Sequence, residues 1–89
     1  MKHLINFCRD FRTEVLKLTL QEVENISFTP VKTLSAFENG RSTNINHLNL
    51  YYLLCKNKEQ RALFIQGFDK AMDLDRLEGN AWKIYYIAQ

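Results

Sequence analysis

The side chains that most often carry out chemistry are scattered along this chain. The cysteines, Cys8 and Cys55, and the histidines, His3 and His47, are not clustered at the short spacings typical of metal sites. No serine, histidine and acid arrangement, phosphate-cradling glycine loop or paired-carboxylate cleft can be assembled. We therefore expect no enzyme activity, no metal and no cofactor, and we interpret both cysteines as small buried apolar residues.

The charge of the chain is nearly balanced. Twelve Lys and Arg residues against ten Asp and Glu residues give a net charge of +2, and the two halves divided after Ile45 each carry six cations and five anions. This balance excludes histone-like charge neutralisation. It still allows a compact positive patch on one face, which is sufficient for a small nucleic-acid-binding domain.

The length and composition predict one globular domain that acts inside the cell. The chain has 89 residues, of which 46% are hydrophobic. A core of this size supplies little stability, so we expect self-association. The cysteines are too sparse for a disulfide scaffold, which favours the reducing cytoplasm. No leader is evident, and the longest apolar run, Leu50 to Cys55, is far below the roughly 20 residues of a membrane span.

Apolar spacing predicts an all-α fold of five short helices. The first covers roughly residues 3–17. Its apolar stripe consists of Leu4, Cys8, Phe11, Val15 and Leu18. Thr19 is the predicted N-cap of the second helix, with Glu22 as its capping-box partner and Val23 and Ile26 as the buried face.

The third predicted helix has a start signal and an end signal in the sequence. Thr29 is the expected N-cap, and Pro30 follows at the first helical position, where its missing N–H costs nothing. The helix extends to about Glu38. Asn39 and Gly40 then close it, because glycine tolerates the left-handed conformation that ends helices.

The fourth predicted helix runs from Asn46 to about Lys56 and the fifth from about Lys58 to Met72. The fourth is apolar on two sides and should be covered on both, its stripes being Ile45, Leu48, Tyr52 and Cys55, and Leu50, Leu53 and Leu54. The fifth offers Ala62, Ile65, Phe68 and Met72, widened by Leu63, Phe64 and Ala71. We divide the chain into a domain at 1–73 and a C-terminal extension at 74–89, in which residues 79–89 form a strand or a short last helix.

The segment TLQEVENISFTPVKTLSAFENGRS, residues 19–42, carries a family resemblance. It resembles, without a gap, the helix-turn-helix of the lambda-repressor-like (Cro/CI, XRE-type) family. That family has a capped helix with Gln-Glu, a turn, and a helix of the form Thr-Ile/Leu-Ser-x-aliphatic-Glu-x-Gly-Lys/Arg. The resemblance covers roughly residues 4–56 and implies a five-helix lambda-repressor-like domain.

The resemblance implies a role for particular residues. A helix fits the DNA major groove, and its N-terminal residues face the base edges. The implied base-reading residues are Val31, Lys32, Thr33 and Ala36. The implied contacts to the DNA backbone are Thr19, Leu20, Asn39, Gly40, Arg41 and Ser42. Arg12 resembles the family arginine that pairs with the glutamate equivalent to Glu38.

The function implied by the resemblance is that of a sequence-specific transcriptional regulator. It would be a homodimeric repressor of a phage, mobile-element or toxin–antitoxin operon, bound to double-stranded DNA with an inverted repeat. We expect the pairing surface on the fifth helix and Trp82 to Ile87, with Leu50, Leu53 and Leu54. The alternative is an inhibitor or antitoxin that keeps the fold, does not read DNA, and binds a protein through its C-terminal aromatic segment.

Two residues depart from the family pattern. Phe28 stands where the family turn has glycine, and a bulky residue at positive φ is unusual. The turn must therefore adopt another geometry or carry strain, and strain would make Phe28→Gly neutral or stabilising. We favour burial of Phe28 in the core, in which case the same change would be costly. Glu24 replaces a small alanine, and we expect its carboxylate to tilt outward or to pair with Lys32.

Overall fold

All regular elements are helices in residues 2–42 and 46–78, which are the part of the chain that this computed structural model describes. In order they are α1 (Lys2–Asp10), η1 (Phe11–Leu16), α2 (Leu20–Ser27), α3 (Val31–Glu38), α4 (Asn46–Leu53) and α5 (Lys58–Leu77). Because η1 continues α1 directly, these make five helices, and the all-α prediction is confirmed. The strand or last helix expected at 79–89 lies outside the described residues.

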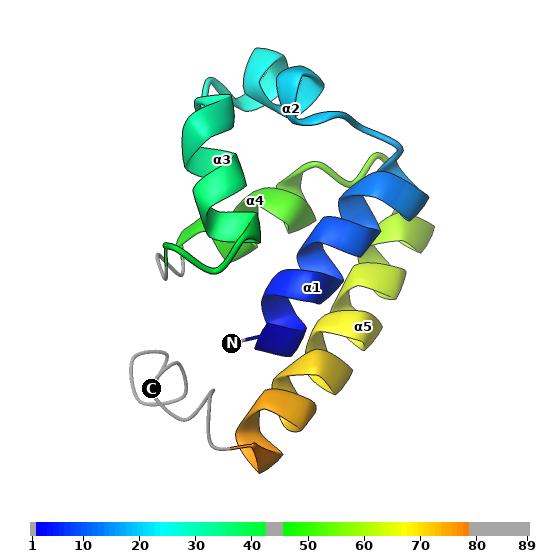
Figure 1. The fold of residues 1–89 in the computed structure, drawn as a ribbon. Helices are drawn as coiled ribbons and strands as arrows, with labels where there is room; N and C mark the ends of the chain where they lie inside the picture. Colours follow the sequence, from blue (N-terminus) through cyan, green and yellow to red (C-terminus); the bar gives the residue numbers. More distant parts are fainter. Residues whose placement is uncertain (1, 43–45, 79–89) are drawn as a thin grey trace.

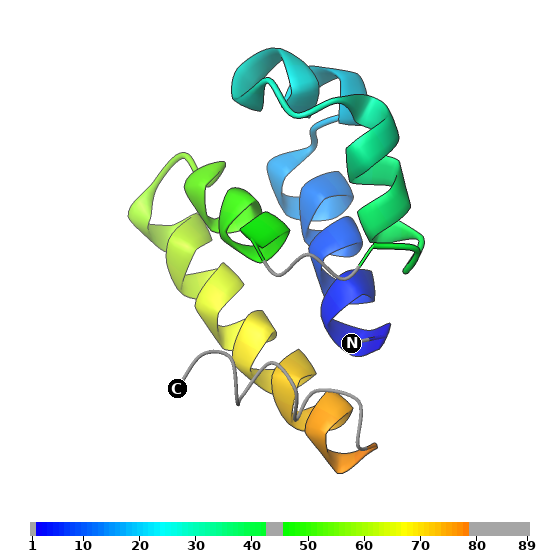
Figure 2. The same cartoon turned by 90° about the vertical axis from the view of Figure 1, so that its left-hand side faces the viewer.

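Four of the five helices form two pairs, and α4 lies between α3 and α5 (Figures 1 and 2). α1 and α5 lie side by side and run in opposite directions. α2 and α3 follow each other at the far end, with α3 on the opposite side of the molecule from α5. Within the described ranges, no helix combines the length and apolar character that crossing a membrane requires.

The first helix changes its winding halfway along. α1 is an ordinary α-helix, whereas η1 is a π-helix, in which hydrogen bonds close over five residues. Because the wider winding changes which residues share a face, Phe11 and Leu16, five residues apart, are buried and Val15 is only partly buried. The predicted stripe assumed α-helical spacing and is corrected here. η1 ends at Lys17, whose φ is 55°.

α2 begins with the predicted capping box. Thr19 Oγ1 accepts a hydrogen bond from the Glu22 N–H at 3.1 Å, and Glu22 Oε1 accepts one from the Thr19 N–H at 3.0 Å. Both interactions with Thr19 lower the pKa of Glu22. The hydrogen bond from the Thr19 backbone N–H has the larger effect, and the one with the Thr19 side chain the smaller. Val23 is buried as predicted, but Ile26 is 57% exposed. α2 packs chiefly against α3 and turns its Val23 side toward the core.

α3 begins one position later than the sequence indicated. Pro30 takes the N-cap position and Val31 is the first helical residue, so Thr29 does not cap the helix. The helix ends at Glu38, as predicted. Gly40 follows with a left-handed φ of 76°, which glycine adopts without steric cost.

α4 and α5 bury only some of the predicted residues, among them Leu48 on α4. On α4 the fully buried side chain is Tyr51, whereas Leu53 is 76% exposed. On α5 Phe64 and Ala71 are buried, but Ile65 is 56% exposed. The predicted apolar stripe passed from Leu48 to Tyr52, four residues on. It therefore missed Tyr51, which lies three residues after Leu48 and is the residue that is buried.

The ends of these two helices also differ from the prediction. α4 stops at Leu53, before Lys56, because the chain tightens into a turn in which the Cys55 N–H bonds to the Tyr52 carbonyl. Asn57 then caps α5 by accepting from the Gln60 N–H at 2.8 Å. α5 continues unbroken through residues 73 and 74 and ends at Leu77.

Aromatic rings join the two long helices. The Phe11 and Phe64 rings meet edge to face with centroids 5.2 Å apart, and the Phe7 ring lies 5.4 Å from that of Phe64. Phe7 packs directly onto Gly67, where an added Cβ would overlap its ring. The glycine in the middle of α5 therefore permits the close approach of α1.

A buried carboxylate ties the end of α5 to the start of α1. Asp75 is fully buried, and its two oxygens accept hydrogen bonds from the N–H groups of His3 and Leu4, each at 2.9 Å. The first N–H groups of a helix have no partner within it, and a negative charge is favourable there. Asp75 thus acts as a cap for α1 from the opposite end of the sequence.

Candidate functional site

The outer face of α3 is hollowed. Val31, Lys32, Ser35 and Ala36 line a depression of about 610 Å³, together with Arg41 from the turn that follows. Three of the four residues assigned to base reading, all but Thr33, are therefore brought together here. Ser35 was not predicted, although it lies four residues after Val31 and so shares its helix face.

The inner face of α3 anchors this surface. Leu34 and Phe37 are fully buried in the core. Thr33 is half-buried and does not line the hollow. α3 therefore presents one apolar face to the domain and one mixed face, with Lys32 and Ser35 beside Val31 and Ala36, outward.

The residues assigned to backbone contacts lie at helix ends. Asn39, Gly40 and Arg41 are exposed after α3, and Ser42 beside them is half-buried. Thr19 is exposed at the start of α2, where its hydroxyl is engaged in the capping box, and Leu20 is half-buried against the core. Of this set, Arg41 borders the α3 hollow.

A buried polar cluster holds α3 in place. Arg12 donates two hydrogen bonds of 2.8 Å to Glu38, from Nε to Oε2 and from Nη2 to Oε1. Arg12 Nη1 also donates to the Leu18 carbonyl at 2.7 Å, and the Tyr51 hydroxyl donates to Glu38 Oε2 at 2.7 Å. Side chains from η1 and α4 thus converge on the Glu38 carboxylate of α3, whose acceptor capacity is well satisfied.

Tyr51 was not recognised from the sequence as part of this cluster. Burial, followed by its hydrogen bond with Glu38, raises the pKa of Tyr51. The hydroxyl therefore stays protonated and remains a donor across the physiological range. The available signal was its place three residues after Leu48, on the same helix face.

Glu24 caps α3. Its Oε1 accepts a hydrogen bond from the Val31 N–H at 2.7 Å, and its Oε2 accepts one from Gln21 at 3.1 Å. Pro30 at the N-cap position has no side chain able to accept that bond. The carboxylate therefore pairs with the backbone rather than with Lys32, and it lies where the helix dipole favours a negative charge.

Phe28, which ends α2, is not a core residue. Its φ is 61° and its side chain is 88% exposed, so the predicted burial is wrong. The chain needs a left-handed residue at this turn, where the Phe28 N–H bonds to the Glu24 carbonyl at 2.8 Å. Because so little of the ring is buried to offset it, this conformation costs energy in a residue with a bulky side chain.

We expect Phe28→Gly to stabilise the protein by about 1 kcal/mol. Relief of roughly 1–2 kcal/mol of left-handed strain exceeds the entropy that glycine adds to the unfolded chain. Urea denaturation would measure the gain. Phe28→Ala is the matched control, because it removes the ring and leaves the strain, and it should show no such gain. A loss of 3 kcal/mol for the glycine variant would instead indicate a buried ring.

The remaining reactive groups are enclosed or engaged. Cys8 is fully buried, and this burial, with a smaller effect of Glu38, raises the pKa of its thiol to about 12. His3, Asp75 and Glu78 lie close together, but both Asp75 oxygens accept backbone N–H groups and His3 Nε2 lies 2.8 Å from Glu78 Oε1. Cys8 is thus a protonated, unreactive thiol, and the groups around Asp75 serve structure.

No family model, curated protein or solved structure matches this chain.

Proposed function

We propose that this chain is a lambda-repressor-like helix-turn-helix protein that binds double-stranded DNA in a sequence-specific manner and regulates transcription. α2 and α3 form the motif, and α3 enters the major groove. Lys32 donates to guanine O6 or N7, while Val31 and Ala36 contact thymine methyl groups. Asn39, Gly40 and Arg41 hold the phosphate backbone.

The observation that carries this proposal is the outer face of α3. Lys32 and Arg41 border one hollow, while the opposite face of the helix is locked into the core by Leu34 and Phe37. A rigidly held helix with a cationic outer face is what reading a DNA groove requires. The Arg12–Glu38 pair supports the same arrangement, because it fixes the C-terminal end of α3 against η1.

The test is selection of a duplex from a random DNA pool, followed by fluorescence anisotropy with the selected sequence. Lys32→Ala should weaken binding about tenfold and relax the preference at one base pair, as expected for loss of one base contact. Lys70→Ala is the control, provided that light scattering gives it the wild-type mass, because Lys70 is exposed and α5 lies on the opposite side of the molecule from α3 (Figure 1). If the wild-type protein selects no sequence, the proposal is wrong.

We further propose that the regulator is a homodimeric repressor that pairs through α4 and α5. Exposed apolar side chains on these helices favour this surface, namely Leu53, Leu63 and Ile65. Leu54, which we expected on the pairing surface, lies in the core and cannot contribute to it. Leu50 is partly buried against the same core. A monomeric mass by light scattering at tens of micromolar protein would remove the dimer from the proposal.

The same exposed surface favours a second candidate, a protein-binding inhibitor or antitoxin that does not read DNA. Salt separates the two functions, because DNA affinity falls steeply as salt rises, whereas an apolar protein interface responds little. The C-terminal aromatic segment expected to contact such a partner lies outside the described residues.

A further inference from the structure

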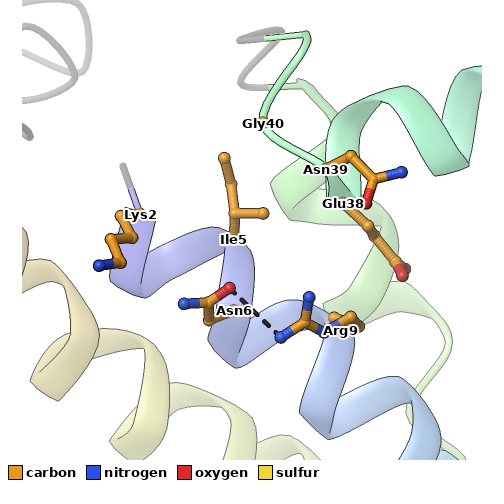
Figure 3. Close-up of a pocket in the computed structure, with 7 residues that line it drawn as sticks. All are labelled: Lys2, Ile5, Asn6, Arg9, Glu38, Asn39 and Gly40. Carbon is orange, nitrogen blue, oxygen red and sulfur yellow. Dashed lines mark hydrogen bonds between the residues drawn. The ribbon is translucent and has the colours of Figure 1, made fainter.

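A second hollow lies between α1 and the C-terminal end of α3 (Figure 3). Its volume is about 420 Å³. Lys2, Asn6 and Arg9 line it from α1, where their spacing of four and three residues places them along one stripe. Asn39 and Gly40 line the other side. None of the sequence-based assignments includes the three α1 residues.

The lining of this hollow is positively charged. Within the described residues Lys2 has no ion-pair partner. The one ion pair of Arg9 there is a long one with Asp10, 3.7 Å from Nε to Oδ1, between half-exposed side chains. Such an exposed pair holds the guanidinium weakly. The one acid among the lining residues is Glu38, whose charge is already balanced by Arg12. An anion entering the hollow would therefore meet two available cations.

Neutral donors accompany the two cations. The Asn6 side-chain oxygen accepts from Arg9 at 3.4 Å, and the Asn6 amide nitrogen points toward the Lys2 side of the hollow (Figure 3). Gly40, at a φ of 76°, has no side chain and no atom within 4 Å of where a Cβ would lie, so the backbone is open on that side. Cations combined with amide donors and open backbone are suited to the oxygens of a phosphate group.

We propose that this hollow binds a phosphate group, and that in the DNA complex it holds a backbone phosphodiester next to the base pairs read by α3. This inference rests on the proposed function. Gly40 lines this hollow and Arg41, its neighbour in the chain, lines the hollow on α3. Lys2, Arg9, Lys32 and Arg41 therefore border two adjacent depressions, which one DNA strand can follow.

The decisive measurement is the salt dependence of DNA binding by a Lys2→Ala/Arg9→Ala double variant. We expect weaker binding, an unchanged base preference, and a slope of log affinity against log salt that is shallower by about 0.9, which corresponds to one phosphate contact. The control is Lys58→Ala/Lys70→Ala on α5, which removes the same charge. Light scattering first checks that its mass equals that of the wild-type protein, so that pairing through α5 is intact, and the variant should then keep the wild-type slope. Both lysines are exposed.

Each outcome separates this inference from the proposed function. If the wild-type protein binds DNA and the double variant keeps its slope, the phosphate site is wrong and the proposed function stands. If the wild-type protein binds no DNA, both are wrong. An NMR titration identifies the source of the phosphate: the amide signals of Asn6, Arg9 and Gly40 should shift with duplex DNA. Shifts with inorganic phosphate but none with duplex would overturn the assignment to DNA.

Discussion

Arg12→Ala is expected to destabilise the protein by about 3–5 kcal/mol, which is the usual cost of removing one member of a buried ion pair. The variant leaves the Glu38 carboxylate buried with the Tyr51 hydroxyl and without its cation, and it also frees the Leu18 carbonyl. Domains of this size have a total stability of roughly 5–15 kcal/mol, so the loss is large. Urea denaturation followed by circular dichroism would measure it.

Two further variants keep this result interpretable. Arg12→Lys retains the charge but cannot reproduce the two-pronged contact, so we expect an intermediate loss and a folded protein. Arg9→Ala removes an exposed arginine of the same helix and should change stability by no more than about 1 kcal/mol. An Arg12→Ala denaturation curve that superimposes on the wild-type curve would show that the pair contributes nothing.

Asp75→Ala is expected to destabilise the protein by about 2–4 kcal/mol. The substitution removes two charge-assisted hydrogen bonds and leaves the N–H of Leu4 buried without its acceptor. It also removes a favourable charge from the start of α1. Beyond the shift in denaturation midpoint, hydrogen exchange at the His3 and Leu4 amides should accelerate, since their acceptor is gone.

Neighbouring acidic positions supply the comparison for Asp75. Asp73→Ala removes an exposed carboxylate that contacts Arg76 at 3.1 Å and should change stability by no more than about 1 kcal/mol. Asp75→Asn keeps one acceptor oxygen and should fall between the alanine variant and the wild type. Equal stability of the Asp73 and Asp75 alanine variants would contradict the cap. The sequence-based division ended the domain at residue 73. A domain cut there would lack the Asp75 carboxylate that caps α1.

The local features of the fold were predictable because their physics acts over a few residues. The capping box joins Thr19 to Glu22, three positions away, and the left-handed Gly40 closes α3 next to it. Apolar spacing was sufficient to predict five helices, because buried side chains on a helix recur every three or four residues. The same spacing rule placed Val15 on the buried stripe, although it is only partly buried, because η1 is a π-helix and not an α-helix.

The roles of Phe28 and Glu24 required the path of the chain. The sequence showed that each departs from a family pattern, but not how the departure is accommodated. Phe28 is exposed because the turn between α2 and α3 needs a left-handed residue at a point that no other element covers. Glu24 reaches the Val31 N–H because the same turn folds the start of α3 back beside α2.

By itself the sequence determined the helices, the capping box of α2, the glycine that closes α3 and the face of α3 that points outward. Only the tertiary structure decided which side chains meet across the molecule. Asp75 caps α1 from 71 residues away in sequence, and Tyr51 joins Glu38 from a separate helix. The hollow lined by Lys2, Arg9 and Gly40 likewise exists only where α1 lies against the end of α3. Such contacts depend on how helices pack, which local spacing leaves undetermined, because many pairings bury similar apolar faces.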